Sequence, residues 1–106
     1  MIDIEQLRSY FEDDTVFTTE HAAERFHQRG IKISDIRNAV DTGEIIEQYP
    51  DDFPFPSCLI LGNDKNSKPI HICMSDEGTA GRIITAYYPD LSKWNNDLKT
   101  RKERLL

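Results

Sequence analysis

The sequence predicts an α+β domain, with two or three N-terminal helices packed on a four-stranded antiparallel sheet and a C-terminal helix after it. Three observations carry this prediction. Apolar residues recur at helical spacing in residues 1–43, polar turns separate four short apolar runs in residues 44–88, and a basic stretch with an apolar stripe closes the chain. The 106 residues, 38% apolar and 30% charged, suit one folded domain that spans residues 1–106.

The expected helices cover about residues 3–13, 20–29 and 35–42. In the first, Ile4, Leu7 and Phe11 share one helix face. Thr18 and Thr19 offer N-cap oxygens to the second helix. A glycine follows both the second and the third segment, at the position where helices commonly end.

The expected strands cover residues 44–49, 57–62, 69–75 and 82–88. A proline-rich loop separates the first two strands, and polar turns at residues 63–68 and 76–81 join the others. Strands joined by such short connections pair with their neighbours in the chain, so we expect an antiparallel meander.

A last helix is expected to begin near Asp90 or Ser92. Its apolar stripe consists of Leu91, Trp94, Leu98 and Leu105. Arg101 falls in the same stripe, where an apolar residue is usual. We therefore expect its stem to lie on the core and its guanidinium to emerge at an edge.

Charge and composition restrict the classes of partner and cofactor. A net charge of −6 argues against nucleic acid, yet basic residues concentrate in residues 25–37 and 93–104, which indicates either a local basic face or solvated helix surfaces. No apolar run approaches the roughly 20 residues that cross a membrane, and the N-terminus lacks the pattern of a secretory signal. We expect a cytoplasmic protein that binds no membrane, no metal and no cofactor, with both cysteines as thiols.

The expected helix over residues 20–29 carries a basic ridge. At about 100° per residue, His21, Arg25 and Gln28 lie close together, with Arg29 one step round. Two arginines four residues apart repel mildly and favour an anion, which is either a carboxylate elsewhere in the fold or a phosphate. The alternative for His21 is an exposed histidine without a role.

Two residues of the expected sheet are suited to proton transfer. Strand alternation places His71 on the face opposite Ile70 and Ile72, and histidine exchanges protons near neutral pH. Tyr87, near the end of the last strand, could stack on a base or donate a hydrogen bond to a phosphate. The alternatives are a hydrogen-bonded sheet histidine and an ordinary half-buried aromatic.

These residues belong to a longer pattern. It comprises His21-Ala22-x-x-Arg25-x-x-x-Arg29-Gly30-Ile31, Gly43-Glu44-Ile45-Ile46-Glu47-x-Tyr49-Pro50, Pro69-Ile70-His71 and Ile84-Thr85-Ala86-Tyr87-x-Pro89-Asp90. Over roughly residues 18–101 the pattern resembles DUF4258, a bacterial and phage-borne domain-of-unknown-function family. That family looks like a branch of the RelE/barnase/colicin-type ribonuclease fold, in which N-terminal helices pack on a four-stranded antiparallel sheet.

The resemblance implies a metal-independent endoribonuclease of the toxin type, without a cofactor. In this chemistry the ribose 2′-hydroxyl attacks the neighbouring phosphate while a base and an acid move protons and cations stabilise the charge. The implied catalytic residues are His21, Arg25, His71 and Tyr87, and the implied substrate-binding residues are Arg29 and Arg101.

Within that set, the resemblance assigns acid–base work to His71 or His21. Arg25, together with Arg29, would hold the phosphate, and Tyr87 would donate a proton or stack. The alternative is a non-catalytic protein-binding module on a toxin-like fold, whose arginines would be locked in internal ion pairs. The expected partners are RNA and a cognate antitoxin or another protein.

Overall fold

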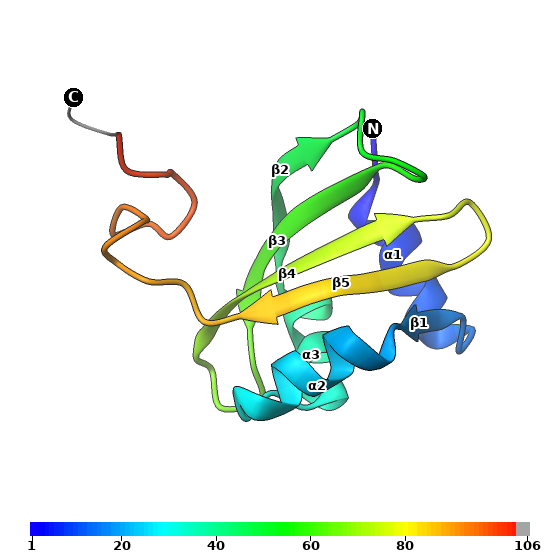
Figure 1. Ribbon diagram of the computed structural model, residues 1–106, viewed down its shortest axis with the longest axis horizontal. Helices are drawn as coiled ribbons and strands as arrows, with labels where there is room; N and C mark the ends of the chain where they lie inside the picture. Colours follow the sequence, from blue (N-terminus) through cyan, green and yellow to red (C-terminus); the bar gives the residue numbers. More distant parts are fainter. Residues whose placement is uncertain (104–106) are drawn as a thin grey trace.

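The computed structural model describes residues 1–103 of the chain. It has a mixed α+β fold of three helices and a five-stranded sheet (Figure 1). The elements in order are α1 (Ile4–Glu12), β1 (Val16–Thr18), α2 (Glu20–Gln28), α3 (Ile33–Thr42), β2 (Glu44–Tyr49), β3 (Ser57–Asn63), β4 (Pro69–Asp76) and β5 (Gly81–Tyr87). The three predicted helices and four predicted strands are confirmed within two residues at their ends.

The sheet has the strand order β1-β5-β4-β3-β2. Strands β2 to β5 form the predicted antiparallel meander, but β1 pairs with β5 in parallel, so the prediction of four antiparallel strands was wrong in this respect. A three-residue run such as Val16–Thr18 is too short to show strand alternation. Its pairing depends on contacts with residues far along the chain, which no local pattern reveals.

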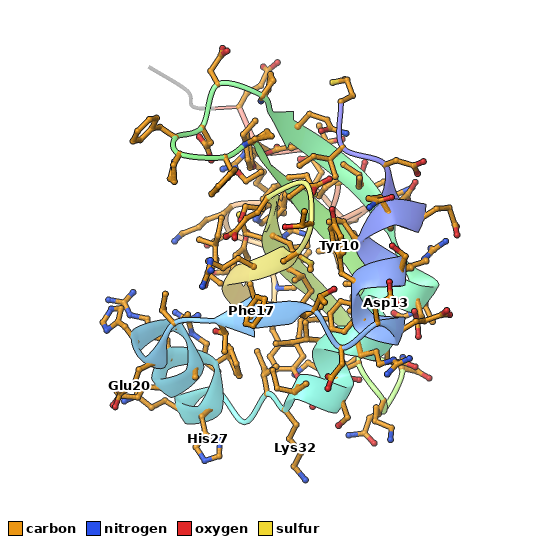
Figure 2. The ribbon with its side chains drawn as sticks, turned by 90° about the vertical axis from the view of Figure 1, so that its right-hand side faces the viewer. Tyr10, Asp13, Phe17, Glu20, His27 and Lys32 are labelled. Atoms are coloured by element: carbon orange, nitrogen blue, oxygen red, sulfur yellow. The ribbon has the colours of Figure 1, made fainter. Side chains whose placement is uncertain are left out.

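Helices α1 and α3 lie behind the sheet in Figure 1 and cover one of its faces. The core between these layers includes Leu7, Ile36, Ile60 and Ile72, which are fully buried. Tyr10 projects from α1 toward the sheet (Figure 2) and donates a hydrogen bond to the Asp76 carboxylate at 2.6 Å. This layer leaves the other face of the sheet for the polar residues of the strands.

Helix α2 runs along the β1–β5 edge of the sheet (Figure 1). Thr19 caps it, accepting a hydrogen bond from the Ala22 amide at 3.0 Å, and Ala22 and Phe26 are its buried residues. Gly30 follows with a φ of +72°, a conformation that glycine adopts without strain. Most of the remaining surface of α2 is exposed, including its basic ridge.

The predicted C-terminal helix is wrong over the described residues. Residues 90–103, here called the C-terminal strap, leave the end of β5 as turns (Figure 1), and an antiparallel bridge joins Trp94 to Arg101. The Asp97 carboxylate accepts hydrogen bonds from the Lys99 and Thr100 amides, and such side-chain bonds compete with helix formation. Within the predicted stripe Trp94 is buried and Leu91 is exposed, while Leu105 lies outside the described residues.

No helix among residues 1–103 is long and apolar enough to cross a membrane.

Candidate functional site

A row of three paired residues crosses the three middle strands of the sheet at the level where β5 ends. His71 of β4 lies between Leu61 of β3 and Tyr87 of β5. The flanking Ile70 and Ile72 belong to the core under the helices, so alternation turns His71 to the opposite face. Sequence reasoning reached this placement of His71 because β4 alternates regularly.

His71 is fully buried despite facing away from the helices. Its Nδ1 lies 3.1 Å from the Tyr87 hydroxyl and its Nε2 lies 2.7 Å from the Leu98 carbonyl oxygen. The Trp94 ring meets the imidazole edge-on at 4.6 Å between centroids, and Tyr87 does so at 5.3 Å. Burial lowers the pKa of His71 below its ordinary value, although the Leu98 carbonyl and Glu47 oppose this, so the ring is neutral at pH 7.

The strap that covers His71 is fastened to β2 by two ion pairs. Arg101 binds Glu47 through two hydrogen bonds of 2.9 and 3.0 Å, and Lys99 pairs with Glu44. The Arg101 guanidinium also lies 4.7 Å above the Trp94 ring centroid. The strap thus crosses from the end of β5 to the far edge of the sheet.

A hollow of about 420 Å³ opens where the strap leaves β5. Its lining residues are Arg29, Tyr87, Tyr88, Asp90, Lys93, Trp94 and Arg101. Three of these carry positive charge and one carries negative charge, on a chain whose net charge is −6. Two other hollows of similar volume, beside Gln48 and beside Asn63, have no lysine or arginine in their lining. This charge pattern singles out the hollow at the end of β5 as the candidate site.

Tyr87 connects the hollow with the buried histidine. Its side chain is half-buried and lines the hollow, while its hydroxyl meets His71 Nδ1. Burial raises the pKa of the Tyr87 phenol, so the hydroxyl keeps its proton at neutral pH. A protonated phenol beside cations can exchange a proton with a bound molecule.

The basic ridge of α2 reaches the hollow at one end. Arg29 donates to the Ala86 carbonyl at 2.9 Å and to the Thr85 hydroxyl at 3.4 Å, and its guanidinium lines the hollow. Arg25 and His21 stand one and two turns earlier on the same ridge and are exposed. Within residues 1–103 neither forms an ion pair or a side-chain hydrogen bond. His27 projects from α2 away from the sheet (Figure 2).

The structure therefore brings together four of the six predicted site residues. Tyr87, Arg29 and Arg101 line one hollow, and His71 lies directly behind Tyr87. His21 and Arg25 are not among its lining residues.

Sequence reasoning missed Glu47, Trp94 and Lys93 as members of this site. Glu47 pairs with Arg101 across 54 positions of the chain, and no local spacing predicts such a contact. Trp94 and Lys93 were assigned to a helix that does not form, so the faces expected for them were wrong. A cluster of lysines and arginines near the C-terminus was the one visible signal.

Nothing in residues 1–103 gathers three or more His, Cys, Asp or Glu side chains in a way that could hold a metal ion. The cysteines lie on opposite faces of the sheet as free thiols, and burial raises the pKa of Cys58 to about 12 and of Cys73 to about 11. Neither thiol is a nucleophile at neutral pH. The ionisable groups that line the hollow are therefore phenols, guanidinium and ammonium groups and the Asp90 carboxylate, with the His71 imidazole behind Tyr87.

Fold and site together define a small α+β domain with a cationic hollow backed by a tyrosine–histidine pair. The model of DUF4258, a domain of unknown function, matches residues 18–88, and the chain belongs to this family. The match covers α2 to β5 and ends before the strap. Searches of curated proteins and of solved structures found no significant match.

Proposed function

We propose that the chain is a metal-independent endoribonuclease of the toxin type, on a RelE/barnase-like fold, with its site in the hollow at the end of β5. One observation carries the proposal: Arg29, Lys93 and Arg101 line the same hollow as Tyr87, whose hydroxyl is bonded to a buried histidine. Cations near a proton-transfer group are what ribose-assisted cleavage of RNA requires.

The reaction begins with the ribose 2′-hydroxyl, which attacks the adjacent phosphorus and displaces the 5′-oxygen of the next nucleotide. Arg29 and Lys93 stabilise the negative charge that collects on the phosphate oxygens. Tyr87 exchanges a proton with the reacting group, because it is the titratable hydroxyl that lines the hollow and touches His71. The products carry a 2′,3′-cyclic phosphate and a free 5′-hydroxyl.

The charge distribution favours a small RNA or one presented by a protein. The whole chain is acidic and repels a long polyanion, whereas the hollow itself is cationic. Binding therefore depends on a few local contacts and weakens as salt concentration rises, with a slope set by that small number of contacts. A protein partner such as a cognate antitoxin would have to cover or occupy this hollow.

The test is cleavage of total tRNA and of mRNA by the full chain in the presence of EDTA. We expect fragments with 2′,3′-cyclic ends, and at least a 100-fold slower reaction for Tyr87→Phe, the scale of a lost acid–base group. Arg29→Ala should slow cleavage by roughly 10- to 100-fold, since one charge-stabilising donor is lost.

Arg37→Ala is the matched control, because Arg37 is an exposed arginine on α3 outside the lining of the hollow. It should leave the rate unchanged. His21→Ala and Arg25→Ala test the two ridge residues that lie outside the hollow, and we expect effects below about tenfold, the size of one screened phosphate contact. Absence of cleavage by the wild type, or equal rates for wild type and Tyr87→Phe, contradicts the proposal.

A second candidate is a non-catalytic protein-binding module on the same fold. The observation that favours it is the sealing of His71, whose two ring nitrogens are both hydrogen-bonded and which has no exposed surface. Pairing of Arg101 with Glu47 points the same way. Against it, Arg25 and Arg29 form no ion pair within residues 1–103, although this candidate predicts that they would.

The two functions differ in what the Tyr87→Phe variant does. If the chain is a binding module, neither the wild type nor the variant cleaves RNA, and the loss of the hydroxyl changes the affinity for the partner alone. In a ribonuclease Tyr87→Phe slows cleavage at least 100-fold and leaves the affinity for uncleavable RNA within a few-fold of the wild type.

A further inference from the structure

The buried position of His71 excludes direct contact with a molecule in the hollow. Its ring is fully enclosed by Tyr87, Trp94 and Leu98, and it is not among the residues that line the hollow. Any effect of His71 on chemistry there must pass through Tyr87, which has one side in the hollow and its hydroxyl on the imidazole.

The contacts of the imidazole determine its tautomer. Leu98 contributes a backbone carbonyl, which can only accept, so the proton must lie on Nε2, 2.7 Å away. In the neutral ring Nδ1 is then an acceptor, and the hydroxyl 3.1 Å away must donate to it. The proton of Tyr87 therefore points toward the imidazole, and the lone pairs of its oxygen stay free to accept a proton.

The backbone of the strap is unusual at the residue that makes this contact. Leu98 has a φ of +60°, a left-handed conformation that non-glycine residues rarely adopt and that clusters at functional positions. Backbone hydrogen bonds on both sides hold the turn, from Leu98 N to Asn95 O at 2.9 Å and from Asn95 N to Thr100 O at 2.8 Å. The turn presents the Leu98 carbonyl to the imidazole.

We infer that His71 is a positioning residue that acts through Tyr87, with its tautomer fixed by the Leu98 carbonyl of the C-terminal strap. The structural part stands by itself, and the catalytic part rests on the proposed function. Because the family match ends at residue 88, the strap adds a component of the site from outside the matched region. Other charged groups near the imidazole are Glu47 of β2 and Arg101 of the strap.

The proton path follows from this arrangement. As the 2′-oxygen forms its bond to phosphorus, its proton passes to the Tyr87 oxygen and the Tyr87 proton passes to His71 Nδ1. The bond from phosphorus to the 5′-oxygen breaks, and that oxygen takes a proton from solvent. The imidazolium, whose charge Glu47 offsets, then returns its proton through Tyr87 to solvent.

The first test is the ¹⁵N spectrum of the His71 imidazole at pH 7 in the full chain. We expect the shifts of a neutral ring with the proton on Nε2, in the wild type and in Leu98→Gly, which keeps the carbonyl and suits a positive φ. Leu98→Pro cannot adopt a φ of +60° and should release Nε2, giving a mixture of tautomers. A proton on Nδ1 in the wild type overturns the inference, whether or not the chain cleaves RNA.

The second test measures RNA cleavage by His71→Asn and by His71→Gln, each against the wild type, after unfolding curves have shown that both variants fold. The asparagine oxygen can still accept the Tyr87 hydroxyl but cannot take its proton. If His71 relays the proton, both variants lose at least 100-fold in kcat, and the fall in kcat/KM at acid pH, caused by protonation of His71, disappears. Cleavage by His71→Asn at the wild-type rate overturns the relay.

The outcomes for the two proposals are distinct. A wild type with the expected tautomer and no cleavage contradicts the proposed function and supports the structural part of the inference. A wild type that cleaves RNA but carries the proton on Nδ1 supports the proposed function and contradicts the structural part of the inference.

Discussion

Glu47 sets the charge balance beside the hollow, since it binds Arg101 at two atoms. The hydrogen bonds from Arg101 lower the pKa of Glu47, burial opposes this, and the hydrogen bond from Tyr49 adds to the lowering. A carboxyl whose pKa is depressed on folding contributes stability above its unfolded pKa and loses that contribution as the pH falls through its folded value. The pair therefore stabilises the strap at neutral pH and is lost in acid.

We predict that Glu47→Gln costs about 0.5 to 1 kcal/mol at pH 7, the scale of a solvent-screened pair. The difference from wild type should shrink as the pH falls from about 5 to 3. Urea unfolding at a series of pH values measures it. Glu44→Gln is the control. Both side chains of the Lys99–Glu44 pair are about half exposed, so the loss of stability in Glu44→Gln should be smaller than in Glu47→Gln. A stability difference between Glu47→Gln and the wild type that is the same at all pH values contradicts the conclusion that ionised Glu47 stabilises the strap.

Asp64 is the second residue whose protonation matters, because its carboxylate joins the turn at residues 63–68 to Tyr88 after β5. Its carboxylate accepts from the Tyr88 hydroxyl at 2.8 Å and from the Asn66 and Lys68 amides at 2.9 and 2.8 Å. Burial alone raises the pKa of Asp64, but these donors more than offset it, and the net pKa lies below the ordinary value. Burial, together with the hydrogen bond to Asp64, raises the pKa of Tyr88 to about 12.

Asp64→Asn should destabilise the fold by about 1 to 2 kcal/mol at pH 7, since it leaves a buried donor poorly satisfied. The cost should shrink as the pH falls below about 4, the ordinary pKa of an aspartate, because the native carboxyl, whose pKa is lower, is then progressively protonated. Thermal unfolding checks this, with Asp51→Asn at an exposed position as the control. Equal stability of Asp64→Asn and wild type at pH 7 would falsify the role given to this network.

At the scale of elements, α3 and β3 lie closer together than side chains allow. A Cβ placed on Gly62 would lie 1.9 Å from the backbone oxygen of Ala39, and neither backbone can move aside cheaply. Gly30 makes the opposite case, since it has a φ of +72° and a Cβ added there would meet no atom within 4 Å. One glycine is required by packing and the other by backbone conformation.

Gly62→Ala is accordingly predicted to cost about 3 kcal/mol, at the upper end for overpacking, because α3 must move away from the sheet. Gly30→Ala should cost about 1 kcal/mol, the penalty of a left-handed residue. Denaturant unfolding of both variants gives the comparison. A Gly62→Ala variant no less stable than Gly30→Ala contradicts the close approach of α3 to β3.

Elements with a strong local signal could be predicted from the sequence. The helices have apolar residues at helical spacing and caps such as Thr19. Strands β2 to β5 are short apolar runs, and polar turns or loops separate them. Two features had no such signal. Strand β1 is too short to show alternation. The strap has an apolar stripe at helical spacing, but the hydrogen bond from the Lys99 amide to the Asp97 carboxylate favours a turn over a helix.

The candidate site was predictable only in its sheet and helix components. His71 was placed by strand alternation and Arg29 by helix periodicity. The position of Tyr87 beside His71 depends on a register shift between β4 and β5, and the contacts of Trp94 and Glu47 depend on how the strap folds back. Their partners lie far away in sequence, and no period links them. The strap is therefore the part of the site that required the structure.

At the scale of the whole molecule, an acidic chain presents a cationic hollow where a helix, a strand and a strap meet. Arg29 comes from the end of α2, Tyr87 from β5, and Lys93 and Arg101 from the strap. The strap also encloses His71, so the hollow and the buried imidazole share the same structural support. We propose that this hollow binds the phosphate backbone of RNA.

The most direct measurement is a titration of the ¹⁵N-labelled full chain with a short single-stranded RNA whose 2′-hydroxyls are methylated and which therefore cannot be cleaved. At low salt we expect shift changes at the Arg29 guanidinium, the Trp94 indole and the Tyr87 amide, and their loss as salt is raised. No shift changes, or changes confined to α1 and α3 on the opposite face of the sheet, would contradict it.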